Sequence, residues 1–320
     1  MQDQNNGQVL INKERLDQLL TIEKVLNEQG HFFNILRIAK SKTPSALHIF
    51  EYGAIICYQN ERILYPTHYA GLFSILSTSM WTMIDSIEKF SLLPTRIDTT
   101  FTMMHFKDGI YDNNHDILFE RPNQNSLTTL SKVARLKMGR FDNRGNYNDI
   151  YELELGEEWC RKFVDAYMTP TKKLQDRIDL FSNKYKIKSK KTLVVCYRGT
   201  DREIKEDSDE KYIKSVKDIF IKNNIEQIVI QTEQIQIRQL FKNIFGECCI
   251  WIEELPGTMG SVAMHFEKQK ENGKDEWSMN LVAMVYALSS ADSILTYTGN
   301  IGLYLALFGR IKGKNVYQLR

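Results

Sequence analysis

The 320-residue sequence has little of what marks metal-binding, secreted or membrane proteins. It contains only 5 cysteines, with no Cys-x-x-Cys pair and no histidine at metal-ligand spacing. Neither a zinc site nor a disulfide framework is therefore indicated. The first 20 residues carry charged and amide side chains throughout and lack the apolar core of a signal peptide or membrane anchor. We expect a cytoplasmic protein with no integral membrane segment, no metal site and no bound cofactor.

The sequence also lacks an excess of charge of either sign. Its 42 Lys and Arg residues nearly balance 40 Asp and Glu residues, for a net charge of +2. Nucleic-acid phosphates require a stronger positive field. The densest basic run, residues 184–191, is more typical of a solvated connection than of a nucleic-acid or lipid patch. We therefore expect no nucleic-acid partner.

The chain is long enough, and apolar enough, for two folded domains. Apolar residues make up 42% of the sequence and aromatic residues 11%, and 320 residues exceed the usual size of one domain, roughly 100–200 residues. We place the boundary near residue 185, which gives an N-terminal domain of residues 1–185 and a C-terminal domain of residues 186–320.

Short β-branched runs alternate with helical patterns in the C-terminal part, which predicts an α/β domain with a parallel sheet. The predicted strands are 192–197, 225–231, 248–252, 293–297 and 315–319, and the predicted helices begin near Ser208 and cover 235–245, 279–289 and 301–308. The stretch 256–277 is longer than a routine connection and suggests a functional or mobile loop. Further upstream, residues 54–58 predict a strand and residues 72–90 a long helix.

The segment Val195-Cys-Tyr-Arg-Gly-Thr-Asp201 follows the first of these strands, where ligands bind in open α/β sheets. The guanidinium of Arg198 matches phosphate oxygens, Gly199 allows a close backbone approach, and Thr200 adds a hydroxyl. Asp201 can orient Arg198 or accept a hydrogen bond from a ribose or base. A strand-end turn with a surface ion pair fits the spacing equally well.

A second turn, Thr298-Gly299-Asn300-Ile301-Gly302, lies between a predicted strand and a predicted helix. Amide groups at a helix N-terminus suit a pyrophosphate. Taken alone, the turn is more simply a helix cap formed by Thr298 or Asn300. Two phosphate-competent turns at equivalent strand ends of one sheet together indicate a diphosphate site.

Residues 195–201 resemble the His-x-Arg-x-Thr-Asp motif of the fucosyltransferase superfamily that includes α1,6- and protein O-fucosyltransferases. Gln231-Thr232-Glu233 is similar to the family's Thr-Asp turn, and 291–294 with Thr298-Gly299-Asn300 is similar to its Ser-rich nucleotide-binding turn. The resemblance covers residues 190–310, with a weaker likeness at 69–74, 93–94 and 97–98. It implies a GT-B-like α/β fold, in which two Rossmann-like domains face a cleft and the N-terminal domain carries the acceptor side.

The resemblance also implies roles for single residues. Arg198 would bind the donor β-phosphate, Asp201 would support it, and Glu206 matches an acid–base carboxylate, with Glu203 as the second candidate. The implied donor-binding set is Arg198, Gly199, Thr200, Asp201, Thr232, Glu233, Thr298, Gly299 and Asn300.

Three positions depart from the family pattern. Cys196 stands where the family has histidine, Gly199 replaces a second arginine, and Glu233 replaces an aspartate. Fucose is the first candidate for the donor sugar, and these departures leave rhamnose, xylose or another sugar open. The run Asp207-Ser208-Asp209 formally matches a metal-binding Asp-x-Asp motif, but at a predicted helix start it more simply caps the helix.

These observations predict an inverting, metal-independent glycosyltransferase. It would move a sugar, with fucose as the first candidate, from a GDP-linked donor to a carbohydrate or glycoconjugate acceptor. Two alternatives remain open at this point: a non-catalytic nucleotide- or glycan-binding protein of the same fold, and a sugar-nucleotide epimerase of GT-B fold.

Overall fold

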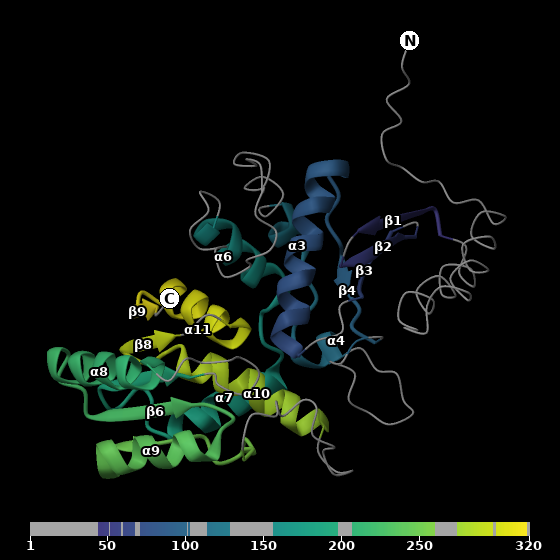
Figure 1. The fold of residues 1–320 in the computed structure, drawn as a ribbon. Helices are drawn as coiled ribbons and strands as arrows, with labels where there is room; N and C mark the ends of the chain where they lie inside the picture. Colours follow the sequence, from purple (N-terminus) through teal and green to yellow (C-terminus); the bar gives the residue numbers. More distant parts are fainter. Residues whose placement is uncertain are drawn as a thin grey trace. The chain divides into compact units, whose positions relative to one another are not determined.

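The computed structural model describes residues 44–50, 52–58, 60–67, 71–100, 102, 114–128, 156–197, 207–259, 274–296 and 299–318. The chain divides into two compact units, Met1–Thr171 and Lys172–Arg320 (Figure 1). This division precedes helix α7 (Lys172–Lys184), whereas the boundary expected near residue 185 follows it. The reason is that α7 packs against α10 (Lys274–Leu288) of the second unit, where Arg177 Nη1 donates to Asn280 Oδ1 at 2.7 Å.

The first unit contains a four-stranded mixed sheet. Its strands β1 (Ala46–Phe50), β2 (Gly53–Cys57), β3 (Arg62–Pro66) and β4 (Arg96–Ile97) lie in sequence order. Short turns make the first three strands antiparallel, while β4 is parallel to β3 because a long helix connects them. A Rossmann-like sheet would be parallel throughout, so the described part of this unit does not have that arrangement.

The connecting helix is α3 (Leu72–Phe90), at the position predicted from the sequence. Several of its buried hydroxyl side chains bond within the helix itself: Ser77 Oγ donates to the Phe73 carbonyl at 2.9 Å and Thr82 Oγ1 to the Thr78 carbonyl at 2.9 Å. The described part of the unit also contains the helices α4 (Asn114–Leu118) and α6 (Gly156–Tyr167) and a helical segment at residues 124–128.

The second unit is built on a five-stranded sheet of order β7-β6-β5-β8-β9, and every pair in it is parallel. The strands are β5 (Thr192–Cys196), β6 (Gln227–Gln231), β7 (Cys249–Ile250), β8 (Ser293–Thr296) and β9 (Asn315–Gln318). The first strand of the unit therefore lies in the middle. The chain builds outward from β5 to β7 on one side and then continues with β8 on the other, as in a Rossmann fold.

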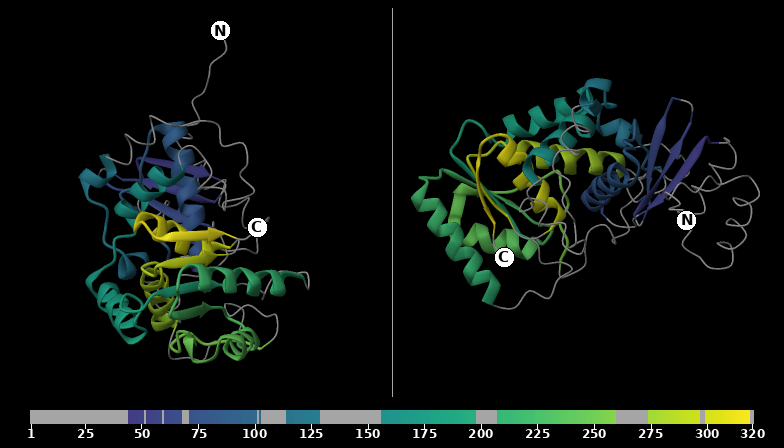
Figure 2. Two further views of the ribbon diagram at one scale, coloured as in Figure 1. Left: turned by 90° about the vertical axis from the view of Figure 1, so that its left-hand side faces the viewer. Right: turned by 90° about the horizontal axis from the view of Figure 1, so that it is seen from above.

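Helices cover both faces of this sheet. Helices α8 (Asp207–Lys222) and α9 (Ile235–Phe245) lie on one face, where Val216 and Phe241 share a core with Val195 and Ile228. Helix α11 (Asn300–Ile311) lies on the opposite face, against Ile294 and Val316, and α10 packs against α11 (Figure 2). A 3-10 turn (Gly246–Cys248) joins α9 to β7.

The α/β class and the alternation predicted for the second unit are confirmed. Gly246 ends α9 with a positive φ of 60°, as its position in the sequence suggested. One boundary differs: α10 begins at Lys274 and not near residue 279. The connection expected over 256–277 is therefore shorter, and its residues 260–273 lie outside the described part of the chain.

Candidate functional site: the carboxyl ends of the parallel strands

The order of the second sheet reverses between β5 and β8, which are direct neighbours with Val195 opposite Leu295. Open α/β sheets bind ligands outside the carboxyl ends of the strands at such a switch point. Both turns singled out in the sequence follow these two strands along the chain. Several of the predicted site residues lie outside the described residues, so their roles stay predictions: Arg198, Gly199, Thr200, Asp201, Glu203, Glu206 and Thr298.

The second turn leads into helix α11. Gly299 is the N-cap, with extended backbone (φ −172°, ψ 162°), and supplies no side-chain cap. Asn300 is the first residue of the helix and not its cap. The amino end of α11 thus begins on a glycine backbone, which leaves room for an anion to approach.

Thr296 is a residue of this region that the sequence analysis missed. It ends β8, its side chain is 1% exposed, and its Oγ1 has no hydrogen-bond partner among the described residues. A buried hydroxyl without a partner is costly, so such a group calls for an explanation. A ligand or a water molecule at the switch point would satisfy it.

Thr232 and Glu233, two of the predicted donor-binding residues, directly follow β6, the neighbour of β5. The Thr232 hydroxyl accepts a hydrogen bond from the Gln234 amide at 3.2 Å and so shapes the turn. Just before it, the Gln231 side chain accepts from Cys196 Sγ at 3.0 Å. The ends of β5 and β6 are therefore joined by this side-chain bond as well as by their backbone pairing.

The turn after β6 is fixed by a buried arginine, Arg238 of α9, which is 8% exposed. Its Nε and Nη2 donate to the Thr232 carbonyl at 3.1 and 2.9 Å. The same guanidinium donates to the carbonyls of Leu255 at 3.3 Å and Pro256 at 3.1 Å. Burial lowers the pKa of Arg238, and the nearby Glu233 carboxylate opposes this shift. Arg238 stays charged, because arginine has a pKa far above neutrality.

The segment after β7 runs beside the turn after β6. The Thr258 amide donates to the Glu233 carbonyl at 2.7 Å, and the Ile235 amide donates to the Thr258 carbonyl at 3.0 Å. Gly257 lies at the closest approach, since a Cβ there would be 2.7 Å from Ile235 Cγ1 and 3.2 Å from Arg238 Nη1. We call this close approach of the two segments at Gly257 the crossing. Only glycine fits there without a shift of its neighbours.

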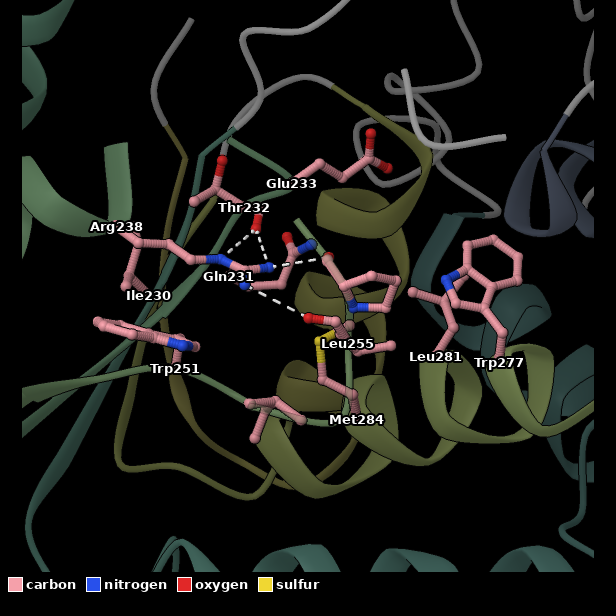
Figure 3. Close-up of a pocket in the computed structure, with 12 residues that line it drawn as sticks. Ile230, Gln231, Thr232, Glu233, Arg238, Trp251, Leu255, Trp277, Leu281 and Met284 are labelled. Atoms are coloured by element: carbon pink, nitrogen blue, oxygen red, sulfur yellow. Dashed lines mark hydrogen bonds between the residues drawn. The ribbon is translucent and has the colours of Figure 1, made fainter. Parts of the chain in front are cut away.

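A shallow pocket opens beside these two segments and is partly open to solvent. Its lining comes from β6, the segment after β7 and α10: Ile230, Gln231, Thr232, Glu233, Arg238, Trp251, Ile252, Leu255, Pro256, Trp277, Leu281 and Met284. Figure 3 shows the two indole rings at opposite sides of the view, with Leu255 and Met284 between them and Glu233 at the upper rim. The pocket is thus mostly apolar and aromatic, with one carboxylate.

The described parts of the chain contain neither a metal-binding cluster nor a membrane-spanning helix. No group of three or more His, Cys, Asp or Glu residues there is arranged to hold a metal ion. None of the helices described is both long and apolar enough to cross a membrane. Helix α8 begins at Asp207, so the run Asp207-Ser208-Asp209 lies in a first helical turn as expected.

No family model matches the chain, and no curated protein matches it. Among solved structures, NodZ α1,6-fucosyltransferase soaked with GDP-fucose is similar at 12% identity and a TM-score of 0.45, covering 77% of this chain and 91% of that one. Fucosyltransferase NodZ from Bradyrhizobium is similar at 11% identity and a TM-score of 0.46, covering 76% and 91%. At these identities and TM-scores, the likeness assigns no activity and no residue role to this chain.

Proposed function

We propose that the chain is a glycosyltransferase whose second unit binds a sugar nucleotide. The observation that carries the proposal is the aromatic pocket at the carboxyl end of β6, the neighbour of β5 in a Rossmann-ordered sheet. The donor proposed is a GDP-linked sugar, with fucose as the first candidate. The acceptor is a hydroxyl of a carbohydrate or glycoconjugate.

The pocket suits a nucleobase. A flat ring can pack against the indoles of Trp251 and Trp277 and against the Met284 thioether. Glu233 at the rim accepts hydrogen bonds only, so it favours a base that presents N–H donors. Guanine presents a ring N–H and an amino group side by side, which supports GDP over UDP in this proposal.

The diphosphate would lie between the base pocket and the switch point. The amino end of α11 at Gly299 and Asn300 and the hydroxyl of Thr296 border that point. In the proposal, the Arg198 guanidinium adds a charged fork for the phosphate oxygens.

The proposed reaction is a single displacement that inverts the anomeric centre. Glu206, with Glu203 as the alternative, removes the proton from the acceptor hydroxyl, whose oxygen then bonds to the anomeric carbon. The bond from that carbon to the diphosphate oxygen breaks, and the electron pair leaves with GDP. Arg198 and the amide groups of α11 stabilise the negative charge on the leaving diphosphate, so the reaction proposed uses no metal ion.

The test is a calorimetric and thermal-shift panel of the full chain with GDP, UDP, CMP and dTDP and their common sugars, each with and without EDTA. We expect stabilisation by GDP or a GDP-sugar that EDTA leaves unchanged, because ligands that bind the native state raise its stability by mass action. If a well-folded sample shows neither binding heat nor a thermal shift with any ligand of the panel, the proposal is overturned. Binding without release of GDP in the presence of carbohydrate acceptors would identify a non-catalytic binding protein instead.

A further inference from the structure

We infer that Arg238 is a positioning residue for the nucleotide site, which it shapes through the backbone without being a ligand group. This inference rests on the proposed function for its ligand and on the geometry for everything else. Its four hydrogen bonds described above all end on main-chain carbonyls, two on Thr232 and one each on Leu255 and Pro256. They hold together two segments that are far apart in the sequence.

Beyond the short β6–β7 ladder, the described residues show few links between these two segments. Strand β7 pairs with β6 only through Cys249 and Ile250, several residues before Leu255. Beyond it, the register is kept by Arg238 and by an isolated bridge between Gln234 and Thr258. The guanidinium therefore extends the alignment of two neighbouring strands past the point where their ladder ends.

The position of Arg238 explains why this matters for a ligand. Residues from both joined segments line the pocket: Thr232 and Glu233 on one side and Leu255 and Pro256 on the other. Figure 3 shows the hydrogen bonds of the guanidinium beneath this wall of the pocket. If the two segments separated, Glu233 and Leu255 would no longer line one pocket.

Burial makes the arrangement rigid. Arg238 is almost inaccessible, and its three carbonyl partners lose their hydrogen-bond donors if it is removed. The planar guanidinium reaches three carbonyls at once, which a lysine ammonium on a flexible stem cannot reproduce. The site needs the shape of the group and not only its charge.

The experiment compares wild type with Arg238→Ala and Arg238→Lys by GDP calorimetry and by hydrogen exchange of peptides that cover residues 232–235 and 255–258. We expect roughly 10- to 100-fold weaker GDP binding in Arg238→Ala. The amides of Ile235 and Thr258, which bond across the two segments, should exchange faster. Arg238→Lys should fold more readily and still show both defects in weaker form.

Chemical rescue separates positioning from a general loss of stability. Millimolar guanidinium chloride, far below denaturing concentrations, should restore protection and GDP affinity in Arg238→Ala by occupying the vacated site. The matched control is Phe241→Leu, one turn further along α9 in the core, which loses stability but does not line the pocket. Guanidinium should give it no rescue.

The outcomes are distinct. Wild-type affinity in both Arg238 variants, or unchanged exchange in both segments, would overturn the inference. Failure of wild type to bind any nucleotide would refute the proposed function, while exchange and its guanidinium rescue would still decide whether Arg238 orders the turn. Equal rescue of Phe241→Leu would show that the defect is one of stability alone.

Discussion

Two nitrogens of Arg238 donate to one oxygen, the carbonyl of Thr232, at 3.1 and 2.9 Å. A carbonyl oxygen has two lone pairs, so both bonds can be made at once. This carbonyl belongs to the residue just before Glu233, the rim carboxylate of the pocket. The predictions below concern this crossing, the residues proposed for chemistry, and one buried histidine of the first unit.

Gly257→Ala should damage the crossing directly. The added Cβ would lie 2.7 Å from Ile235 Cγ1 and 3.2 Å from both Arg238 Nη1 and the Glu233 carbonyl. We expect a loss of about 1–3 kcal/mol in the free energy of unfolding, from overpacking. Nucleotide binding should weaken as well, because two of the crowded neighbours, Glu233 and Arg238, line the pocket.

The control for this change is Gly71→Ala, where an added Cβ meets nothing within 4 Å. Denaturant unfolding and calorimetry of the two variants measure the difference. Equal stability of Gly257→Ala and wild type would show that the crossing is looser than the structure describes.

Arg198→Ala should lose a charge-assisted contact to the donor diphosphate. We expect a loss of about 1.5–3 kcal/mol in binding free energy, roughly 10- to 100-fold in the Kd for the nucleotide. Arg198→Lys keeps the charge but loses the planar guanidinium, so its nucleotide affinity should lie between those of wild type and Arg198→Ala. Unchanged nucleotide affinity and turnover in Arg198→Ala would contradict the role proposed for this arginine.

Glu206→Gln should separate binding from chemistry. The amide keeps the size of the side chain but cannot take a proton, so we expect turnover to fall about 10²- to 10⁴-fold while the donor Kd is unchanged. Glu203→Gln, three residues earlier in the sequence, is the matched control and should retain most activity. If the control loses as much as Glu206→Gln, the two assignments are to be exchanged or abandoned.

His115 makes the first unit sensitive to acid. Burial lowers its pKa from the ordinary 6.5 to about 4, and the neighbouring Asp116 carboxylate opposes that shift only in part. As the pH falls from about 6.5 to about 4, the unfolded chain takes up a proton that the native chain does not. The free energy of unfolding should therefore decrease across this window, by at most about 3 kcal/mol from this group.

The measurement is denaturant unfolding at several pH values for wild type and His115→Gln. The substitution removes the titrating ring, so stability should depend less steeply on pH between about 6.5 and 4. Its lower absolute stability does not affect the comparison, which concerns slopes. Identical slopes would show that other groups cause the acid sensitivity.

Much of the second unit could be predicted from the sequence because buried parallel strands leave a plain signal. A strand such as β5 is buried along its whole length, so its sequence is a short run with little polarity and many β-branched residues. The predicted start of α10 was too late, because its first residues, Lys274 to Glu276, are charged and their sequence resembles a loop. The mixed sheet of the first unit was not predicted, since antiparallel turns and a crossover helix can be assembled in several ways.

The site was predicted less completely. Thr232, Glu233, Gly299 and Asn300 do lie at the strand ends where the sequence placed them. Trp251 and Trp277 join the pocket from segments that only tertiary folding brings together. Arg238 did leave a local signal that was missed. It occupies the apolar stripe of α9 between Ile235 and Phe241, at a spacing of three residues on each side, and a charge at such a position indicates a buried partner.

Strand β7 is only two residues long and forms one edge of the described sheet. An exposed edge normally offers a row of unpaired amides and carbonyls to which a second chain can add a strand. Here the carbonyls of Leu255 and Pro256, a few residues past β7, already accept from a side chain of the same chain. Because β7 itself has only two residues, it offers a second chain a very short row of groups, which makes this edge a poor template for aggregation.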